Sequence, residues 1–302
     1  MAVQPTPPLE VDHSVDDTRG TRTDSSVWLP RVFCVPDPES RVAAVIHKMP
    51  GKWWRLGRWD FATGAYEEGA WFNGRLYPQR CDLSPGGRWF SYLAAKYGSR
   101  WPAGETYNAV SRLPWLKALA AWQEYGTWSR GQHFGPDPAA WPAGAPAVGD
   151  VSILDSVGGI VKTNAAQFAV ERRRGWVESA STPPRDPEDR WDQRRDMVME
   201  KPSPDPECAA VLSVRSQFAA LRSCPTSSPP DPAAYRLTQC GQTAVLTGVQ
   251  WADWTFDGRL AVVTGSGLLQ ILDGRGQQVL RETRPRDGGP RPVPAPAWAS
   301  EW

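Results

Sequence analysis

A turn rich in Pro, Asp and Gly, followed directly by a short apolar strand, recurs along this 302-residue chain. Proline fixes φ near −65°, and Asp and Gly suit the next positions of a tight turn, so each copy reverses the chain. The residues that follow are apolar at consecutive rather than alternate positions, which predicts a strand covered on both faces. The clearer copies begin at Val35, Ser84, Ser203 and Thr255, and a weaker one begins at Gly135.

The spacing of these copies indicates a repeat. Successive copies begin 49, 51, 68 and 52 positions apart, so three steps agree on a period near 50. The long step contains a segment dense in charge and proline at about 178–207, which we expect to be a linker or a surface insertion. Repeats of about 40 to 50 residues, each with several strands and one strand buried on both faces, are typical of stacked four-stranded blades.

Two copies carry a family resemblance. Ser84-Pro85-Gly86-Gly87-Arg88-Trp89 and Thr255-Phe256-Asp257-Gly258-Arg259-Leu260 resemble the Ser-Pro-Asp-Gly-Arg turn, followed by an apolar residue, of TolB-type β-propeller repeats. The chain departs from that pattern at Pro38 and Pro206, which replace Gly, and at Phe256, which replaces Pro. The resemblance therefore implies an all-β, propeller-like fold of about four to five degenerate blades, or an incomplete propeller.

Proline and charge also divide the chain. Residues 1–27 hold three prolines, five acids and few apolar residues, so we expect a flexible N-terminal arm. The propeller-like domain is expected at 28–283, and a proline-rich tail at 284–302. Because that tail holds Trp298 and Trp302, it could dock onto the fold itself or onto a partner.

Several strands are predicted between the turns. An apolar run at 53–61 and another at 68–72 fit strands, and Asn73-Gly74 predicts a hairpin with 75–77. A second hairpin is predicted from 260–264 and 268–272. Residues 114–125 suit either a helix or a strand by their spacing.

The composition excludes some classes of protein. The net charge is +1, so no global basic field favours nucleic acid or anionic membrane, and no apolar run reaches the roughly 18 residues of a membrane span. The five cysteines, an odd number without a Cys-x-x-Cys pair, favour free thiols over a disulfide framework or a zinc site. Together with an N-terminus that lacks signal-peptide character, these features predict a cytoplasmic protein.

The sequence identifies no catalytic residue, metal ligand or cofactor site. Three histidines, His13, His47 and His133, lie outside any nucleophile context, and no His, Cys, Asp or Glu set has metal-ligand spacing. Some acids near expected strand ends could serve a hydrolase: Glu67, Glu68, Asp82, Asp150, Asp155 and Asp253. Asp82 and Asp253 both stand two residues before a turn, however, and such repetition favours a structural role, such as accepting backbone N–H groups.

Two groups remain as binding candidates. Arg172-Arg173-Arg174 and the arginines beyond it lie in a stretch with nine acids to eight bases, which favours a solvated, salt-bridged face over a contact site for nucleic acid. Four tryptophans in a turn-rich span are candidate binding residues, although core packing also explains them: Trp115, Trp122, Trp128 and Trp141.

The leading hypothesis is a non-enzymatic protein-interaction or scaffold module with an unidentified protein partner. The alternatives are a carbohydrate-active or other hydrolase that uses carboxylates and tryptophans in a central pocket, and a component of a larger bacterial assembly that is ordered only in complex. A convergence of the candidate acids in a concave, tryptophan-lined pocket would favour the hydrolase.

Overall fold

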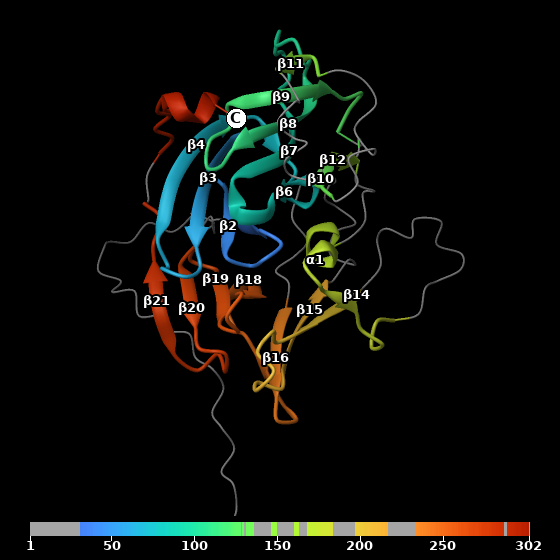
Figure 1. Ribbon diagram of the computed structural model, residues 1–302, viewed down its shortest axis with the longest axis vertical. Coiled ribbons are helices and arrows are strands. Elements are labelled where there is room, and N and C mark those ends of the chain that lie inside the picture. The colour runs from blue at the N-terminus through green and yellow to red at the C-terminus, as the bar shows by residue number, and fades with distance from the viewer. Residues whose placement is uncertain are drawn as a thin grey trace, which may run out of the picture.

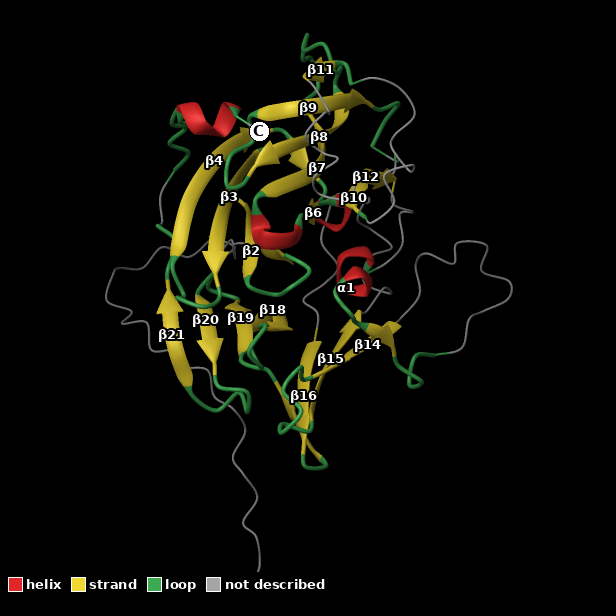
Figure 2. Cartoon of the chain, viewed as in Figure 1, coloured by secondary structure: helices red, strands yellow, loops and turns green. Residues whose placement is uncertain are grey.

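The computed structural model describes residues 31–127, 129, 131–135, 146–149, 160–162, 168–183, 197–216, 234–286 and 289–301. Across these ranges the chain is almost entirely β (Figures 1 and 2). Four antiparallel sheets of four to six strands and one two-stranded sheet are formed, and none of these described sheets closes on itself. The fold is therefore all-β and propeller-like, with degenerate blades, as the repeated turns predict.

The first and last sheets have the orders β1-β2-β3-β4 and β18-β19-β20-β21. Their strands are β1 Arg31–Pro36, β2 Val42–Lys48, β3 Trp53–Asp60, β4 Tyr66–Asn73, β18 Val249–Trp254, β19 Leu260–Thr264, β20 Leu269–Leu272 and β21 Val279–Thr283. β2 and β19 each follow a copy of the repeated turn, and they are buried at every position except Lys48. This burial confirms the doubly covered strand that their uninterrupted apolar residues predict.

The other sheets are less regular. A six-stranded sheet has the order β11-β9-β8-β7-β5, with β6 also on β7; a five-stranded sheet runs from β13 to β17; and β10 pairs with β12. Their strands are β5 Arg75–Leu76, β6 Asp82–Leu83, β7 Trp89–Ala95, β8 Thr106–Arg112, β9 Ala118–Gln123, β10 Gln132–Phe134, β11 Val148–Gly149, β12 Ile160–Lys162, β13 Val177–Glu178, β14 Met197–Pro202, β15 Ala210–Ser216, β16 Ala234–Gln239 and β17 Gln242–Val245. The ambiguous segment 114–125 thus contains a strand, and the charged segment 178–207 contains β14.

The two hairpin predictions have different outcomes. β19 and β20 form the predicted hairpin. Asn73-Gly74 does not form one, because β4 belongs to the first sheet while β5 pairs with β7 of the next. The dipeptide is still a tight connection, in which the Gly74 N–H donates to the Lys52 carbonyl. Turn chemistry predicts the reversal of the chain, but the apolar faces of the flanking strands decide which sheet each strand joins.

The repeated turn has one hydrogen-bond pattern in its four described copies. The backbone N–H of the first turn residue donates across the turn to a carbonyl at or next to the start of the following strand, 2.8 to 2.9 Å away. These first residues are Asp37, Ser84, Ser203 and Thr255. Asp37, rather than Val35, is therefore the structural equivalent of Ser84.

Apolar cores join the sheets side by side. One core joins the five-stranded sheet to the last sheet, a second joins the last sheet to the first, and a third joins the first sheet to the six-stranded one. A smaller core packs Phe134 of β10 against the far face of the six-stranded sheet. The first and last sheets are thus neighbours that pack against each other without exchanging strands.

A short segment at 168–176, which includes helix α1 (Ala169–Arg173), lies between β6 and β14 (Figure 1). Val170 belongs to the core shared by the first and six-stranded sheets. Phe168 and Trp176 belong to the core shared by the five-stranded and last sheets. The segment therefore bridges two cores on either side of the molecule's centre.

Candidate functional site

The centre of the molecule holds a buried cluster of charges. Asp82, at the start of β6, accepts a hydrogen bond from Arg174 at 2.6 Å, and Arg173 lies 3.7 Å from the same oxygen. The side chains of Asp82 and Arg174 are 1% and 3% exposed. Arg174 also donates to the carbonyls of Pro36 and Leu83, so it ties the ends of β1 and β6 together.

A second buried acid lies at the equivalent position of the last sheet. Asp253 accepts hydrogen bonds from Lys201 at 2.7 Å, from the indole N–H of Trp176 at 3.2 Å and from the backbone N–H of Trp254 at 2.7 Å. The positions two residues before the four described turns hold Val35, Asp82, Lys201 and Asp253. The repeat thus places charges of opposite sign where the strands begin to turn.

These contacts give the two acids structural roles. Each accepts a backbone N–H, that of Phe134 for Asp82 and that of Trp254 for Asp253, as the repetition predicts. Each also neutralises a cation, which the repetition does not predict. Asp150 and Asp155 lie outside the described residues.

The arginine run differs from its sequence interpretation. Arg172 is exposed and pairs with Glu178, as expected of a solvated face. Arg174 is buried, so that interpretation is wrong for Arg174. Its partner, Asp82, is 92 positions away, and no local pattern could reveal the pair.

Burial disfavours the charged forms of the neighbouring titratable groups. It raises the pKa of the Cys34 thiol well above the usual value, and the carboxylate of Asp253 raises it further. Burial also raises the pKa of Tyr235 and of Glu171, and lowers that of His133, which Arg173 lowers further. A thiol with a raised pKa is a poor nucleophile at neutral pH, and an imidazole with a lowered pKa is a weaker base. Among the described residues, no group of three or more His, Cys, Asp or Glu could hold a metal ion.

The candidate tryptophans lie in different surroundings. Trp122 is 5% exposed and packs in a core with Trp89 and Phe134. Trp115 is half-buried, and its ring lies edge-on to that of Trp298, with centroids 6.4 Å apart. Trp128 and Trp141 fall outside the part of the chain that the structure describes.

The contact of Trp115 belongs to a docked tail. After β21 the chain passes the first sheet, where Arg55 of β3 donates to the carbonyl of Arg286, and a 3-10 turn at Ala297–Ser300 lies beside β8 (Figure 1). Arg112 donates to the Trp298 carbonyl at 3.0 Å and lies over the Trp298 ring at 4.9 Å. Lys117 donates to the Ser300 hydroxyl. The tail thus docks on the fold itself, one of the two outcomes that its tryptophans predict.

Comparisons with known proteins give similarity at the level of architecture. No family model and no curated protein matches the chain. Two similar solved structures are the β-propeller domain of the Trilobed protease from Pyrococcus furiosus and TolB from Acinetobacter baumannii. The first has 10% identity and a TM-score of 0.27, and the match covers 86% of each chain. The second has 13% identity and a TM-score of 0.23, and covers 82% of this chain and 53% of TolB, about half its length.

Both similar structures are propellers. One of the two, TolB, gives its name to the repeats that the turns at Ser84 and Thr255 resemble.

Proposed function

We propose that this chain is a non-enzymatic interaction module that binds a protein partner on the surface around Trp115. The docked tail carries the proposal, because this surface already holds a segment of chain: the 3-10 turn Ala297–Ser300, which follows a proline-rich stretch. Pro296 has φ −63° and ψ 160°, close to polyproline II. Aromatic surfaces recognise such segments well, since a preformed extended chain loses little entropy on binding.

The partner either replaces the tail on this surface or binds beside it. Trp115 offers an aromatic ring, and Arg112 and Lys117 offer donors to carbonyl or hydroxyl groups of a bound segment, as they do to the tail. Trp128 and Trp141 belong to the same span of sequence and are proposed as further contacts. Trp122 is buried in a core with Trp89 and Phe134.

The hydrolase alternative has less support. A glycosidase needs one carboxylate free to act as nucleophile or base and another able to donate a proton. Asp82 and Asp253 instead hold cations and backbone N–H groups of their own chain.

We also propose a cytoplasmic location. Four of the five cysteines lie in the described residues and are free, which suits a reducing compartment. Within the described ranges, no helix has the length and apolar character needed to span a membrane.

Peptide binding in trans tests the proposed surface. A variant truncated after Gly289 lacks the docked segment, and a labelled peptide of residues 290–302 is titrated into it. We expect saturable binding of the peptide. Trp115→Ala or Arg112→Met should lower its affinity at least about tenfold, because loss of an anchor residue costs about 1.4 kcal/mol or more of binding free energy. Trp53→Ala removes another half-buried tryptophan, whose ring contacts Trp71, and serves as the matched control. Absence of binding, or equal binding by the Trp115 and Trp53 variants, would contradict the proposal.

Recovery of the partner tests the function itself. Full-length, truncated and truncated Trp115→Ala proteins are used as baits in extracts of the native host. We expect one stoichiometric partner that the truncated bait retains and the Trp115→Ala bait loses. Recovery of no stoichiometric partner by any bait would count against an interaction module.

A further inference from the structure

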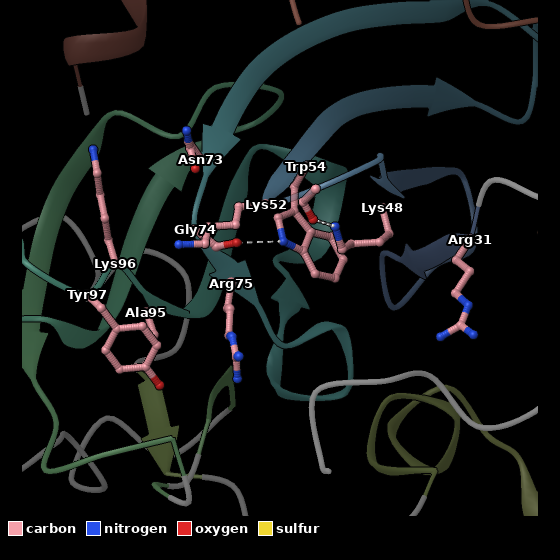
Figure 3. Close-up of a pocket in the computed structure, with 11 residues that line it drawn as sticks. Arg31, Lys48, Lys52, Trp54, Asn73, Gly74, Arg75, Ala95, Lys96 and Tyr97 are labelled. Carbon is pink, nitrogen blue, oxygen red and sulfur yellow. Dashed lines mark hydrogen bonds between the residues drawn. The ribbon is translucent and has the colours of Figure 1, made fainter. Parts of the chain in front are cut away.

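A basic pocket lies on a different part of the molecule, between the first and six-stranded sheets. Its volume is about 480 Å³. Its walls come from the start of β1, the β2–β3 turn, the connection from β4 to β5 and the end of β7. Figure 3 shows Arg31 on one side and Lys96 and Tyr97 on the other, with Trp54, Lys52 and Arg75 between them. The repeated turns lie at the opposite ends of β1 and β2, so the pocket is separate from the central charge cluster.

The lining is strongly cationic. Five described side chains carry positive charge, and none of the described lining residues carries a carboxylate. The five cations are Arg31, Lys48, Lys52, Arg75 and Lys96. The whole chain has a net charge of only +1, so this is a local concentration of charge. None of the five forms a salt bridge with another described residue, whereas Arg174, Lys201 and Arg259 all do.

Lys48 has a structural part in the pocket. Its ammonium group donates to the carbonyls of Met49 and Gly51, which hold the β2–β3 turn. Partial burial lowers the pKa of Lys48, and the nearby guanidinium of Arg31 lowers it further. Like charges are therefore held close together here, and an anion would relieve their repulsion. The other four cations are exposed and can approach a ligand.

Two aromatic rings complete the pocket. Trp54 is 2% exposed, and its indole N–H donates to the Gly74 carbonyl at 3.1 Å, which fixes the ring. Tyr97 is 60% exposed, and Arg75 lies 5.8 Å from its ring centroid. A large exposed aromatic ring beside a cluster of cations can stack on a flat ligand group while the cations hold its charges.

We propose that this pocket binds a small ligand that carries a chain of phosphates, such as a nucleoside triphosphate. A pocket of this volume has the size of small-molecule sites. Each phosphate group brings one to two charges and several acceptor oxygens, so a short polyphosphate matches several cations within a few ångströms. An acidic peptide brings at most one carboxylate per residue and would spread the same charge over a longer path. This ligand site goes beyond the proposed protein-binding surface.

Calorimetric titration of the full-length protein tests the proposal. The probes are inorganic tripolyphosphate and a nucleoside triphosphate, compared with tetraglutamate and a single-stranded oligonucleotide. We expect both phosphate probes to bind, with affinity that falls as salt is raised because exposed charges are screened. The double variant Lys52→Glu/Lys96→Glu should bind tripolyphosphate at least about tenfold more weakly.

A matched variant controls for net charge. Arg236→Glu/Arg275→Glu makes the same change in charge at exposed positions of the five-stranded sheet and of the β20–β21 turn. It should change the affinity less than twofold. All four substituted side chains are exposed, so each variant should keep the wild-type midpoint of thermal unfolding, which confirms that the protein is folded.

Tyr97→Ala distinguishes the two sources of phosphate. If a base stacks on the Tyr97 ring, Tyr97→Ala should lower the affinity for the nucleoside triphosphate severalfold and leave the affinity for tripolyphosphate unchanged. Equal effects on both probes would limit the ligand to the phosphate chain. The proposal is overturned if neither phosphate probe binds, if the two charge variants bind alike, or if tetraglutamate or the oligonucleotide binds more tightly than tripolyphosphate.

Discussion

Asp82 and Arg174 form an ion pair that is almost completely removed from water. A charge buried in this way is costly unless its partner and further hydrogen bonds compensate for lost hydration. Here Asp82 accepts from Arg174 and from the backbone of Phe134, while Arg174 also donates to the carbonyls of Pro36 and Leu83. The pair therefore stabilises the centre only as long as both members are present.

Asp82→Asn should lower the free energy of unfolding by about 3 to 5 kcal/mol, because it leaves the guanidinium of Arg174 buried without a counter-charge. Urea denaturation followed by tryptophan fluorescence measures the change. Glu39→Gln, which breaks the exposed pair with Arg41, is the control and should cost less than about 1 kcal/mol. Similar losses in the two variants would show that burial does not set the energy of the central pair.

His47 should make stability depend on pH. Burial and the nearby Arg55 lower the pKa of His47 to about 3 in the folded protein, from a usual value of 6.5. Between these values the unfolded chain binds a proton that the folded protein does not. The contribution of His47 to the free energy of unfolding is therefore complete above about pH 6.5. It is lost as the pH falls toward 3, at a rate of up to about 1.4 kcal/mol per pH unit.

The difference between wild type and His47→Phe isolates this effect from other titrating groups, such as Asp37. We expect the wild type to lose stability more steeply than the variant between pH 6 and pH 4 in urea denaturation at a series of pH values. Parallel curves would contradict the assigned cause.

At the scale of the element, the repeated turn also joins neighbouring blades. Gly258 has a φ of +76°, and a Cβ at this position would lie 2.7 Å from the Cβ of Asp205 in the turn of the five-stranded sheet. Gly87 has a φ of +68°, and its Cβ would lie 2.9 Å from the Cβ of Val42 in the first sheet. These glycines are needed both for the backbone conformation and for the close approach of the next blade.

Gly258→Ala should therefore destabilise the protein more than a substitution that changes the backbone alone. Gly51→Ala is the matched control, since Gly51 has a φ of +68° and nothing lies within 4 Å of its added Cβ. We expect Gly51→Ala to lower the free energy of unfolding by about 1 to 2 kcal/mol, and Gly258→Ala to lower it by about 1 to 3 kcal/mol more than that. Chemical denaturation measures the free energy of unfolding of both variants. Equal losses would show that the contact between blades does not contribute to the destabilisation.

At the scale of the molecule, the apolar cores lie between sheets rather than within them. Three large cores each combine residues of two neighbouring sheets, and the segment 168–176 contributes to two of them. Loss of one blade would expose the faces of its neighbours. The described sheets should therefore unfold as one unit.

Thermal unfolding tests this cooperativity. Far-ultraviolet circular dichroism follows the sheets, and fluorescence follows tryptophans that are spread over several sheets. We expect the two signals to change at the same midpoint in a single transition. Two separate midpoints would show that some blades fold independently.

The local sequence determines the features that depend on neighbours in the chain. Pro, Asp and Gly in the turns predict the reversals, and the apolar run from Val42 to Ile46 predicts a doubly buried strand, because backbone conformation and burial pattern are set within a few residues. The β-rich class and the repeat follow from them.

The tertiary structure decides which distant residues meet. The sequence predicts the turn at Asn73-Gly74 but not that β5 joins the next blade, and it predicts a structural role for Asp82 but not the pair with Arg174. The docking of Trp298 on Trp115 and the gathering of five cations around Trp54 likewise combine segments from separate parts of the chain. Such contacts depend on how the sheets pack together, and the energy of that packing is shared among residues that no short stretch of sequence contains.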